Sequence, residues 1–365
     1  MSRIRHMYPG GNTCYGFHSF YDNIVSATVE RKIVLKGGPG VGKSTFMKNL
    51  GEAFAEKGYD IEYHWCSSDN NSLDAVVIGN QQICVLDGTS PHVVDPEFPG
   101  AVDEIINLGR FWDKSKIKTH RKEIVELNKN IHLCFVRAYN RLKETSLALE
   151  EWKSYYEEAL DITAVNRNII ALARDFLKDS LPSPHKPRHL FAGAITPQGL
   201  VTKVDSIIDQ DCFLFAVKGN PGTGQKELFR HALTMIDLHG YYAEIYHNPF
   251  NPNEIDFILL PQSKAALIDI SGTFFNYPEI MHSNKYKRLL DFDQFLKKPV
   301  IDSYTSLISA ARERFYAGLR EAVAFIHTAK KYHDELEQYY IPAMDFDAIN
   351  DLCEDLFQEL FASLQ

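Results

Sequence analysis

Cysteine is scarce in this chain and is not arranged in pairs. Six cysteines are spread over 365 residues, and no two of them are spaced as Cys-x-x-Cys. A zinc ribbon needs paired ligands and a disulfide scaffold needs a dense framework, so the sequence excludes both classes. Isolated thiols are typical of a reducing compartment, and we expect a cytoplasmic protein.

Long apolar runs are also missing. No stretch approaches the roughly 18 apolar residues that a membrane-spanning helix requires. The first residues, Met-Ser-Arg-Ile-Arg-His, are not followed by an apolar segment, which argues against a secretory signal. We therefore expect no membrane partner.

Positive charge is in deficit as well. The formal net charge is −9, and the one basic run, Lys114 to Lys122, is followed at once by Glu123 and Glu126. Acidic residues next to a basic run are typical of a solvated helix face, and a duplex-binding protein needs a concentrated basic surface. The sequence thus argues against a nucleic-acid partner.

What the chain does have is a glycine-rich segment, residues 36–45, that reads Lys-Gly-Gly-Pro-Gly-Val-Gly-Lys-Ser-Thr. It fills the phosphate-loop pattern G-x-x-x-x-G-K-[ST] without a mismatch. Glycines let backbone N–H groups approach a polyphosphate, the lysine reaches the β- and γ-phosphates, and the hydroxyl ligates Mg²⁺. The pattern predicts contacts to a nucleoside triphosphate from Gly37, Gly38, Pro39, Gly40, Val41, Gly42, Lys43, Ser44 and Thr45.

The surroundings of the motif agree with this prediction. Arg31 to Lys36 is a short apolar run typical of a strand, and Ser44 to Lys57 has its apolar residues at helical spacing. A phosphate loop lies between a strand and a helix whose N-terminus points at the phosphates. The first half also lacks the Asn/Thr-Lys-x-Asp motif that reads guanine, so we expect ATP.

A magnesium site is predicted beside the loop. The apolar strand Ile83 to Asp87 ends in a carboxylate, and in phosphate-loop proteins this position holds the metal together with the loop hydroxyl. Ser44 and Asp87 are the expected Mg²⁺ ligands. The pattern recurs as Ala265 to Asp269.

The group that would activate the attacking water is less clearly marked. Many ATPases carry a glutamate directly after the strand's aspartate, but this chain has Gly88 there. Asp69, in the polar loop after the preceding strand, is the favoured base, and Asp74 is the alternative. His92 is a further catalytic candidate, as a sensor of the γ-phosphate or a proton shuttle. Any arginine finger is left open between Arg110, Arg188 and another subunit.

The chain repeats itself. A shift of 182 residues lays Lys218–Lys226 over Lys36–Ser44, and a shift of 184 aligns later residues such as Tyr155 and Tyr156 with Tyr339 and Tyr340. We infer an ancient tandem duplication. In the second copy Gln225 replaces the loop lysine and Lys226 replaces the metal-binding serine, so we expect one live site and one degenerate site.

The order of elements predicts an α/β fold with two tandem phosphate-loop domains, each with a parallel, doubly wound sheet and a long helical hairpin. The first domain is residues 1–181 and the second is residues 188–365. Long amphipathic helices are expected from about 103 to 177 and again from about 303 to the end. A proline-rich linker, Leu181 to Pro187, joins the two copies.

The intact loop, Cys66-Ser67-Ser68-Asp69, Leu86 to His92 and the altered second loop together resemble a family of tandem-duplicated bacterial phosphate-loop ATPases. That family is largely uncharacterised and occurs chiefly in Gram-positive spore formers. The resemblance implies ATP and Mg²⁺ as cofactors and covers nearly the whole chain, but it implies no substrate.

Three functions remain open on the sequence. The favoured one is a Mg-dependent ATPase whose nucleotide state is coupled to the helical arms or to an unidentified protein partner. The second is a kinase acting on a nucleotide or small metabolite. The third is a nucleotide-stabilised scaffold with negligible turnover. The absence of an evident arginine-rich lid disfavours the kinase.

Overall fold

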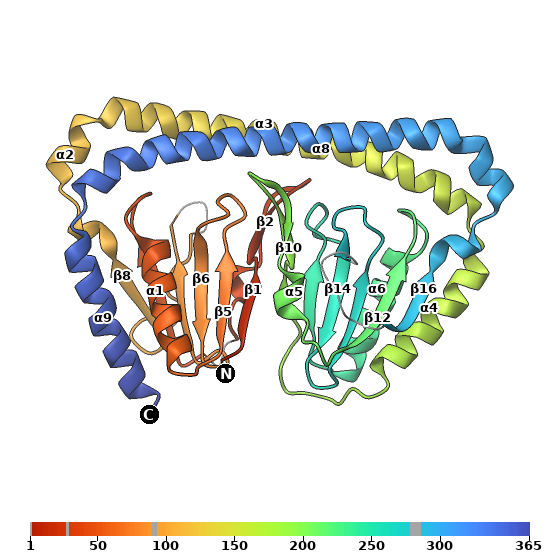
Figure 1. Ribbon diagram of the computed structural model, residues 1–365, viewed down its shortest axis with the longest axis horizontal. Helices are drawn as coiled ribbons and strands as arrows, with labels where there is room; N and C mark the ends of the chain where they lie inside the picture. Colours follow the sequence, from red (N-terminus) through yellow and green to blue (C-terminus); the bar gives the residue numbers. More distant parts are fainter. Residues whose placement is uncertain (1, 27–28, 90–92, 278–285) are drawn as a thin grey trace.

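A computed structural model describes residues 2–26, 29–89, 93–277 and 286–365, and it shows a mixed α/β protein with two six-stranded sheets (Figure 1). The residues up to 181 contribute one sheet and those from 188 contribute the other. The elements of the first half are β1 (Ile4–Met7), β2 (Gly10–Thr13), β3 (Gly16–Ser19), η1 (Tyr21–Asn23), β4 (Arg31–Lys36), α1 (Lys43–Glu56), β5 (Ile61–Trp65), β6 (Leu73–Ile78), β7 (Ile83–Asp87), β8 (Asp103–Asn107), η2 (Leu108–Phe111), α2 (Lys114–Thr119), α3 (Arg121–Ala159) and α4 (Ile162–Leu177).

The second half repeats this order. Its elements are β9 (Arg188–Leu190), β10 (Gly193–Thr196), β11 (Gly199–Thr202), α5 (Val204–Ile207), β12 (Phe213–Lys218), α6 (Gln225–His239), β13 (Glu244–His247), β14 (Ile255–Leu260), β15 (Ala265–Asp269), β16 (Tyr286–Asp291), η3 (Phe292–Phe295), α8 (Lys298–Tyr340), η4 (Ile341–Ala343) and α9 (Phe346–Ser363).

Both sheets have the same strand order and the same directions. The first runs β1-β5-β6-β7-β4-β8, and the second runs β9-β13-β14-β15-β12-β16. In each, the third strand of that order is antiparallel to both neighbours, and the remaining pairs are parallel. The expectation of a fully parallel sheet is therefore wrong. Only four residues separate β6 from β7, whereas a parallel connection needs a dozen or more.

The expectation of long helices on both faces of a doubly wound sheet does not hold for the first sheet, where helices cover one face and the short η1 helix with its neighbouring loops covers the other. Ile33 and Val85 pack with α1 and α9, whereas Val34 and Leu86 pack against Tyr21 and its neighbours. The segment 103–107, expected to begin the helical region, is strand β8 at the sheet edge beside β4.

The expected hairpin within each half is replaced by a pair formed between the halves. Helices α3 and α8 lie side by side and antiparallel across one end of both sheets (Figure 1). Their shared seam buries Ala138, Leu142, Phe315 and Ile326. An amphipathic stripe must be buried against another apolar surface, and here the stripe of each arm meets that of the other copy.

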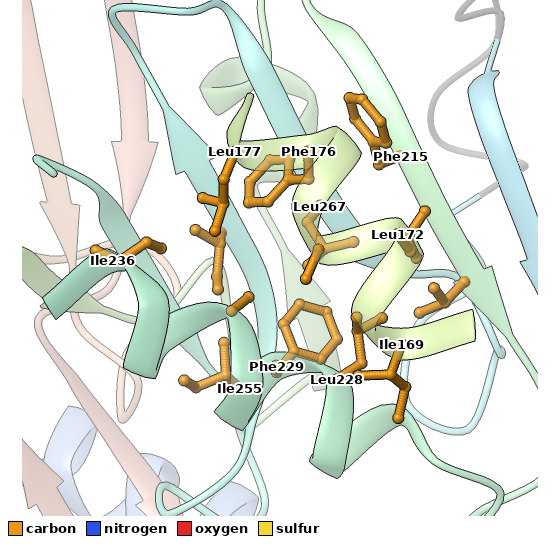
Figure 2. Close-up of a cluster of buried hydrophobic side chains, with 14 of the residues drawn as sticks. Ile169, Leu172, Phe176, Leu177, Phe215, Leu228, Phe229, Ile236, Ile255 and Leu267 are labelled. Atoms are coloured by element: carbon orange, nitrogen blue, oxygen red, sulfur yellow. The ribbon is translucent and has the colours of Figure 1, made fainter. Parts of the chain in front are cut away.

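The helix after each long arm packs on the sheet of the other half. Helix α4 covers α6 of the second sheet, where Leu172 and Phe176 are almost fully buried (Figure 2). Helix α9 covers α1 of the first sheet in the same way, through residues that include Phe357. Each such side chain contributes about 1.5–3 kcal/mol through burial, so the exchanged helices are integral parts of both cores.

A buried ion cluster joins the two sheets at their β1 and β9 edges. Arg5 donates to both oxygens of Glu244 at 2.7 and 2.9 Å, and Arg188 donates to Glu62 at 2.7 Å. Burial alone would raise the pKa of the Glu62 carboxyl, but Arg188 and Arg5 outweigh burial and hold it well below its usual range. Arg188 is thus committed to the interface and is not available as an arginine finger.

All six cysteines are free thiols. Among the helices of the described residues, none combines the length and the apolar character needed to cross a bilayer.

The contact between the long helices gives a testable prediction. A Cβ at Gly318 of α8 would lie 2.1 Å from Oγ1 of Thr145 on α3. Gly318→Ala should therefore destabilise the protein by about 1–3 kcal/mol through overpacking, although alanine is intrinsically favoured over glycine in a helix by about 1 kcal/mol.

The matched control is the double variant Gly318→Ala with Thr145→Ala. Because the threonine hydroxyl is absent, the clash is removed, and the double variant should be more stable than Thr145→Ala alone by the helix propensity of alanine over glycine. The measurement is urea unfolding followed by circular dichroism. If Gly318→Ala alone proved stabilising, the close approach of the two helices here would be wrong.

Candidate nucleotide site

The glycine-rich segment lies where the sequence places it, between the end of β4 and the start of α1. Gly40 and Gly42 have φ of +65° and +87°, a left-handed conformation that favours glycine, and Gly42 directly precedes α1. The backbone N–H groups of the first helical turn have no acceptor within the helix. The loop and the helix N-terminus thus form a concave donor surface suited to phosphate oxygens.

Lys43 is the first residue of α1, and its side chain folds back across the loop. Its Nζ donates to the Gly38 carbonyl at 2.7 Å and lies 3.6 Å from Oδ2 of Asp87. Strand β7, which carries Asp87, pairs directly with β4, and Asp87 stands opposite Leu35. The pairing of these two strands brings the lysine and the carboxylate together.

The two expected magnesium ligands are both present at this end of the sheet. Ser44 Oγ accepts a hydrogen bond from Leu73 N at 3.0 Å. Asp87 Oδ1 accepts from Thr89 N at 2.8 Å, and Oδ2 faces Lys43. A hydroxyl and a carboxylate are the hard oxygen ligands that Mg²⁺ takes when substrate phosphates and water complete its shell.

Asp69 lies in the loop between β5 and β6, near the serine side of the site. It accepts from Ser72 Oγ at 2.8 Å and from Asn71 N at 3.1 Å, so it orders that loop. The alternative base, Asp74, is only 3% exposed within β6. His92 lies outside the described residues.

The sequence did not predict what covers the loop. A Cβ at Gly38 would meet Tyr340 at 3.1 Å, and one at Gly40 would meet Ile341 at 3.1 Å and Glu337 at 3.2 Å. Tyr340 and Glu337 belong to the end of α8, which arrives from the second half of the chain. The intact loop is therefore completed by the other repeat.

The same end of α8 carries a polar cluster. Lys330 Nζ lies 3.4 Å from Oδ2 of Asp69, and it also pairs with Asp334 on its own helix. One ligand atom from each of His333, Asp334 and Glu337 lies within 4.8 Å of the others. The signal in the sequence was the spacing 330, 333/334 and 337, which places these residues on one helix face. Nothing in that spacing says what the face contacts.

The second loop keeps its backbone but fills its own centre. Gly222 and Gly224 have φ of +88° and +129°. The Gln225 amide donates to Gly219 O at 3.1 Å and to Asn220 O at 3.2 Å, in the manner of Lys43 but without the charge. Lys226, at the serine position, is exposed and lies 4.0 Å from Glu254.

Helix α3 covers this second loop as α8 covers the first. A Cβ at Gly222 would lie 2.7 Å from the carbonyl oxygen of Lys153, whose Nζ pairs with Glu254 at 2.7 Å. The register of 184 residues makes Lys153 the counterpart of Glu337. The helix that covers the second loop, which has lost its lysine, thus carries the cation Lys153. The helix that covers the first loop, which keeps Lys43, carries the anion Glu337.

A cavity of about 840 Å³, including its open mouth, lies beside the second loop. Lys153, Gln225, Asp256, Asp269 and Phe274 are among its lining residues. Removal from water, together with the nearby Asp269 carboxylate, raises the pKa of Asp256 to about 8. Burial likewise raises the pKa of Asp269 to about 6. A surplus of carboxylates makes this cavity a poor host for a triphosphate.

No family model, curated protein or solved structure matches the chain.

The Asp256 carboxyl gives a prediction on pH. Its pKa of about 8 in the folded protein exceeds the unfolded value of about 4. The folded state therefore binds the proton more tightly, and the free energy of unfolding falls as pH rises between these values. Asp256→Asn retains an oxygen that can accept from Asn248 and removes the titration. As the pH is raised from 5 to 9, the free energy of unfolding of the variant should rise by at least ~1 kcal/mol relative to that of the wild type.

Urea unfolding of both proteins across this pH range measures the difference. Parallel pH profiles for variant and wild type would show that Asp256 titrates normally.

Proposed function

We propose that the chain binds Mg-ATP at residues 37–45 and hydrolyses it, with a single working site. One observation carries the proposal. Lys43, at the start of α1, lies 3.6 Å from the carboxylate of Asp87 at the end of the neighbouring strand, and the loop just before Lys43 contains two glycines in the left-handed conformation. This arrangement supports a phosphate-loop fold at the first repeat. The altered loop, with Gln225 and Lys226, would hold nucleotide weakly or not at all.

Each residue has a distinct part in this proposal. The loop N–H groups wrap the phosphates, and Lys43 moves from the Gly38 carbonyl to the β- and γ-phosphate oxygens. Ser44 and Asp87 would hold Mg²⁺, which would supply positive charge against the negative charge of the phosphates. Asp69 accepts a proton from water as the water oxygen bonds to the γ-phosphorus, the bond to the bridging oxygen breaks, and ADP leaves.

The covering helix supports a coupling role. Glu337, Tyr340 and Ile341 lie against the loop, so a nucleotide bound there would lie next to the end of α8. Because α8 begins beside the second sheet, nucleotide binding at the first loop could shift α8 along its whole length. We expect that a partner protein binds the helix pair and that its affinity depends on whether the first loop holds nucleotide.

One prediction of this proposed function compares the two loops. Lys43→Ala should weaken ATP binding by at least about tenfold, because a charge-assisted hydrogen bond to phosphate is worth about 1.5–3 kcal/mol. Gln225→Ala removes only an amide that satisfies its own loop, and it should leave ATP affinity within about twofold. Titration calorimetry with Mg-ATP measures both. Equal losses from the two variants would contradict a single working site.

A second prediction concerns the metal. Asp87→Asn should lower phosphate release on the order of a hundredfold, while ATP affinity changes far less, because the loop N–H groups still hold the phosphates. The assay contains ATP and Mg²⁺ with no acceptor metabolite, so phosphate release reports hydrolysis rather than transfer to an acceptor. Wild-type turnover in the variant would remove Asp87 from the site.

A further inference from the structure

Lys330, on α8, lies against the polar loop that contains Asp69. Its ammonium group is 3.4 Å from Asp69, and its side chain is only 21% exposed. Asp69 bonds to Ser72, and the next residue, Leu73, donates its N–H to Ser44 Oγ. Lys330 thus borders the side of the site where the loop serine stands.

The opposite side of the site is bordered by the same helix. Glu337, two turns beyond Lys330, packs against Gly40. A straight helix rises about 1.5 Å per residue, so these seven residues span roughly 10 Å. The face of α8 between Lys330 and Glu337 therefore extends from the Asp69 loop to the glycine loop, over the space that a triphosphate would occupy.

The internal duplication provides an independent comparison. In the second repeat the counterpart of Lys330 is Ser146, by the register of 184, and the counterpart of Asp69 is Asn251, by the register of 182. Both members of the ion pair are absent where the loop has lost its lysine and serine. The pair is present where Lys43 and Ser44 are present. The second repeat ties its arm to the corresponding loop at other positions, through Lys153 and Glu254, so what sets the first repeat apart is the place of its cation beside the serine side of the site.

We propose that Lys330 moves from Asp69 to the γ-phosphate when ATP binds, and so completes the first site from the second half of the chain. The inference rests on the proposed function of that site. At 3.4 Å the Lys330–Asp69 pair is longer than a usual charged hydrogen bond, while Lys330 also pairs with Asp334 on its own helix. A γ-phosphate would offer the ammonium several charged oxygens in place of the single long contact to Asp69. The move also frees the Asp69 carboxylate for water. Lys330 would supply positive charge to the γ-phosphate, the role that an arginine finger has in other nucleotide hydrolases, but as a point charge and not as a planar fork.

The test compares Lys330→Met with Lys331→Met, its exposed neighbour on the same helix, which has no part in the site. Affinities for Mg-ATP and Mg-ADP are measured by calorimetry, and turnover by phosphate release. Lys330→Met should weaken ATP binding about tenfold, leave ADP binding within about twofold, and lower kcat on the order of a hundredfold. Lys330→Arg should restore part of kcat, and Lys331→Met should match wild type.

The outcomes separate the inference from the function on which it rests. Equal weakening of ATP and ADP by Lys330→Met would mean a structural tie, and unchanged ATP binding and turnover would mean no role; either result overturns the inference while leaving the site intact. Failure of the wild-type protein to bind ATP, or binding that survives Lys43→Ala, would overturn the proposed function itself, and with it the role of Lys330.

Discussion

The antiparallel contact between α3 and α8 is the constraint on which the rest of the structure depends. Each helix begins beside the sheet of its own repeat and ends over the glycine loop of the other. The two helices approach closely at Gly318 and Thr145, because Gly318 has no Cβ to meet the threonine side chain. Because each arm leaves its own repeat, the short helix that follows it must complete the core of the opposite sheet. Neither repeat buries its own helix face alone.

The molecule is fixed at two places. The helix pair joins the sheets at the loop end, and the cluster of Arg5, Glu62, Arg188 and Glu244 joins them along the β1 and β9 edges. Near the second place, Tyr8 and Phe191 exchange backbone hydrogen bonds of 2.9 and 3.0 Å. A buried ion cluster is costly to break from one side, because the remaining charge is left unpaired. The two sheets are thereby held in one relative position.

The two repeats share one backbone arrangement but differ in the side chains at their loops. Asp293, in the turn that leads into α8, accepts from both the backbone and the side chain of Asn220 in the second loop. The other end of the same helix covers the first loop. Helix α8 and the turn before it thus run from the altered loop to the intact one. The exchange of charge between Lys153 and Glu337 fits this difference, since each arm complements the loop that it covers.

The local features of this protein were determined by its sequence. Residues 36–45 specify the strand, the left-handed glycines and the helix, and the repeated register specifies two sheets of the same order, because these are matters of neighbouring residues and short connections. The four residues between Ile78 and Ile83 even contain the antiparallel turn that we had not predicted.

Only the tertiary structure decided which surfaces meet. The apolar stripe of a helix specifies that one face is buried but not which partner buries it, so the exchange of α4 and α9 between the repeats and the approach of Lys330 to Asp69 could not be deduced from spacing. The Lys330–Asp69 contact joins residues 261 positions apart in the chain, and it exists because the apolar stripe of α8 is buried against the stripe of α3 from the other copy.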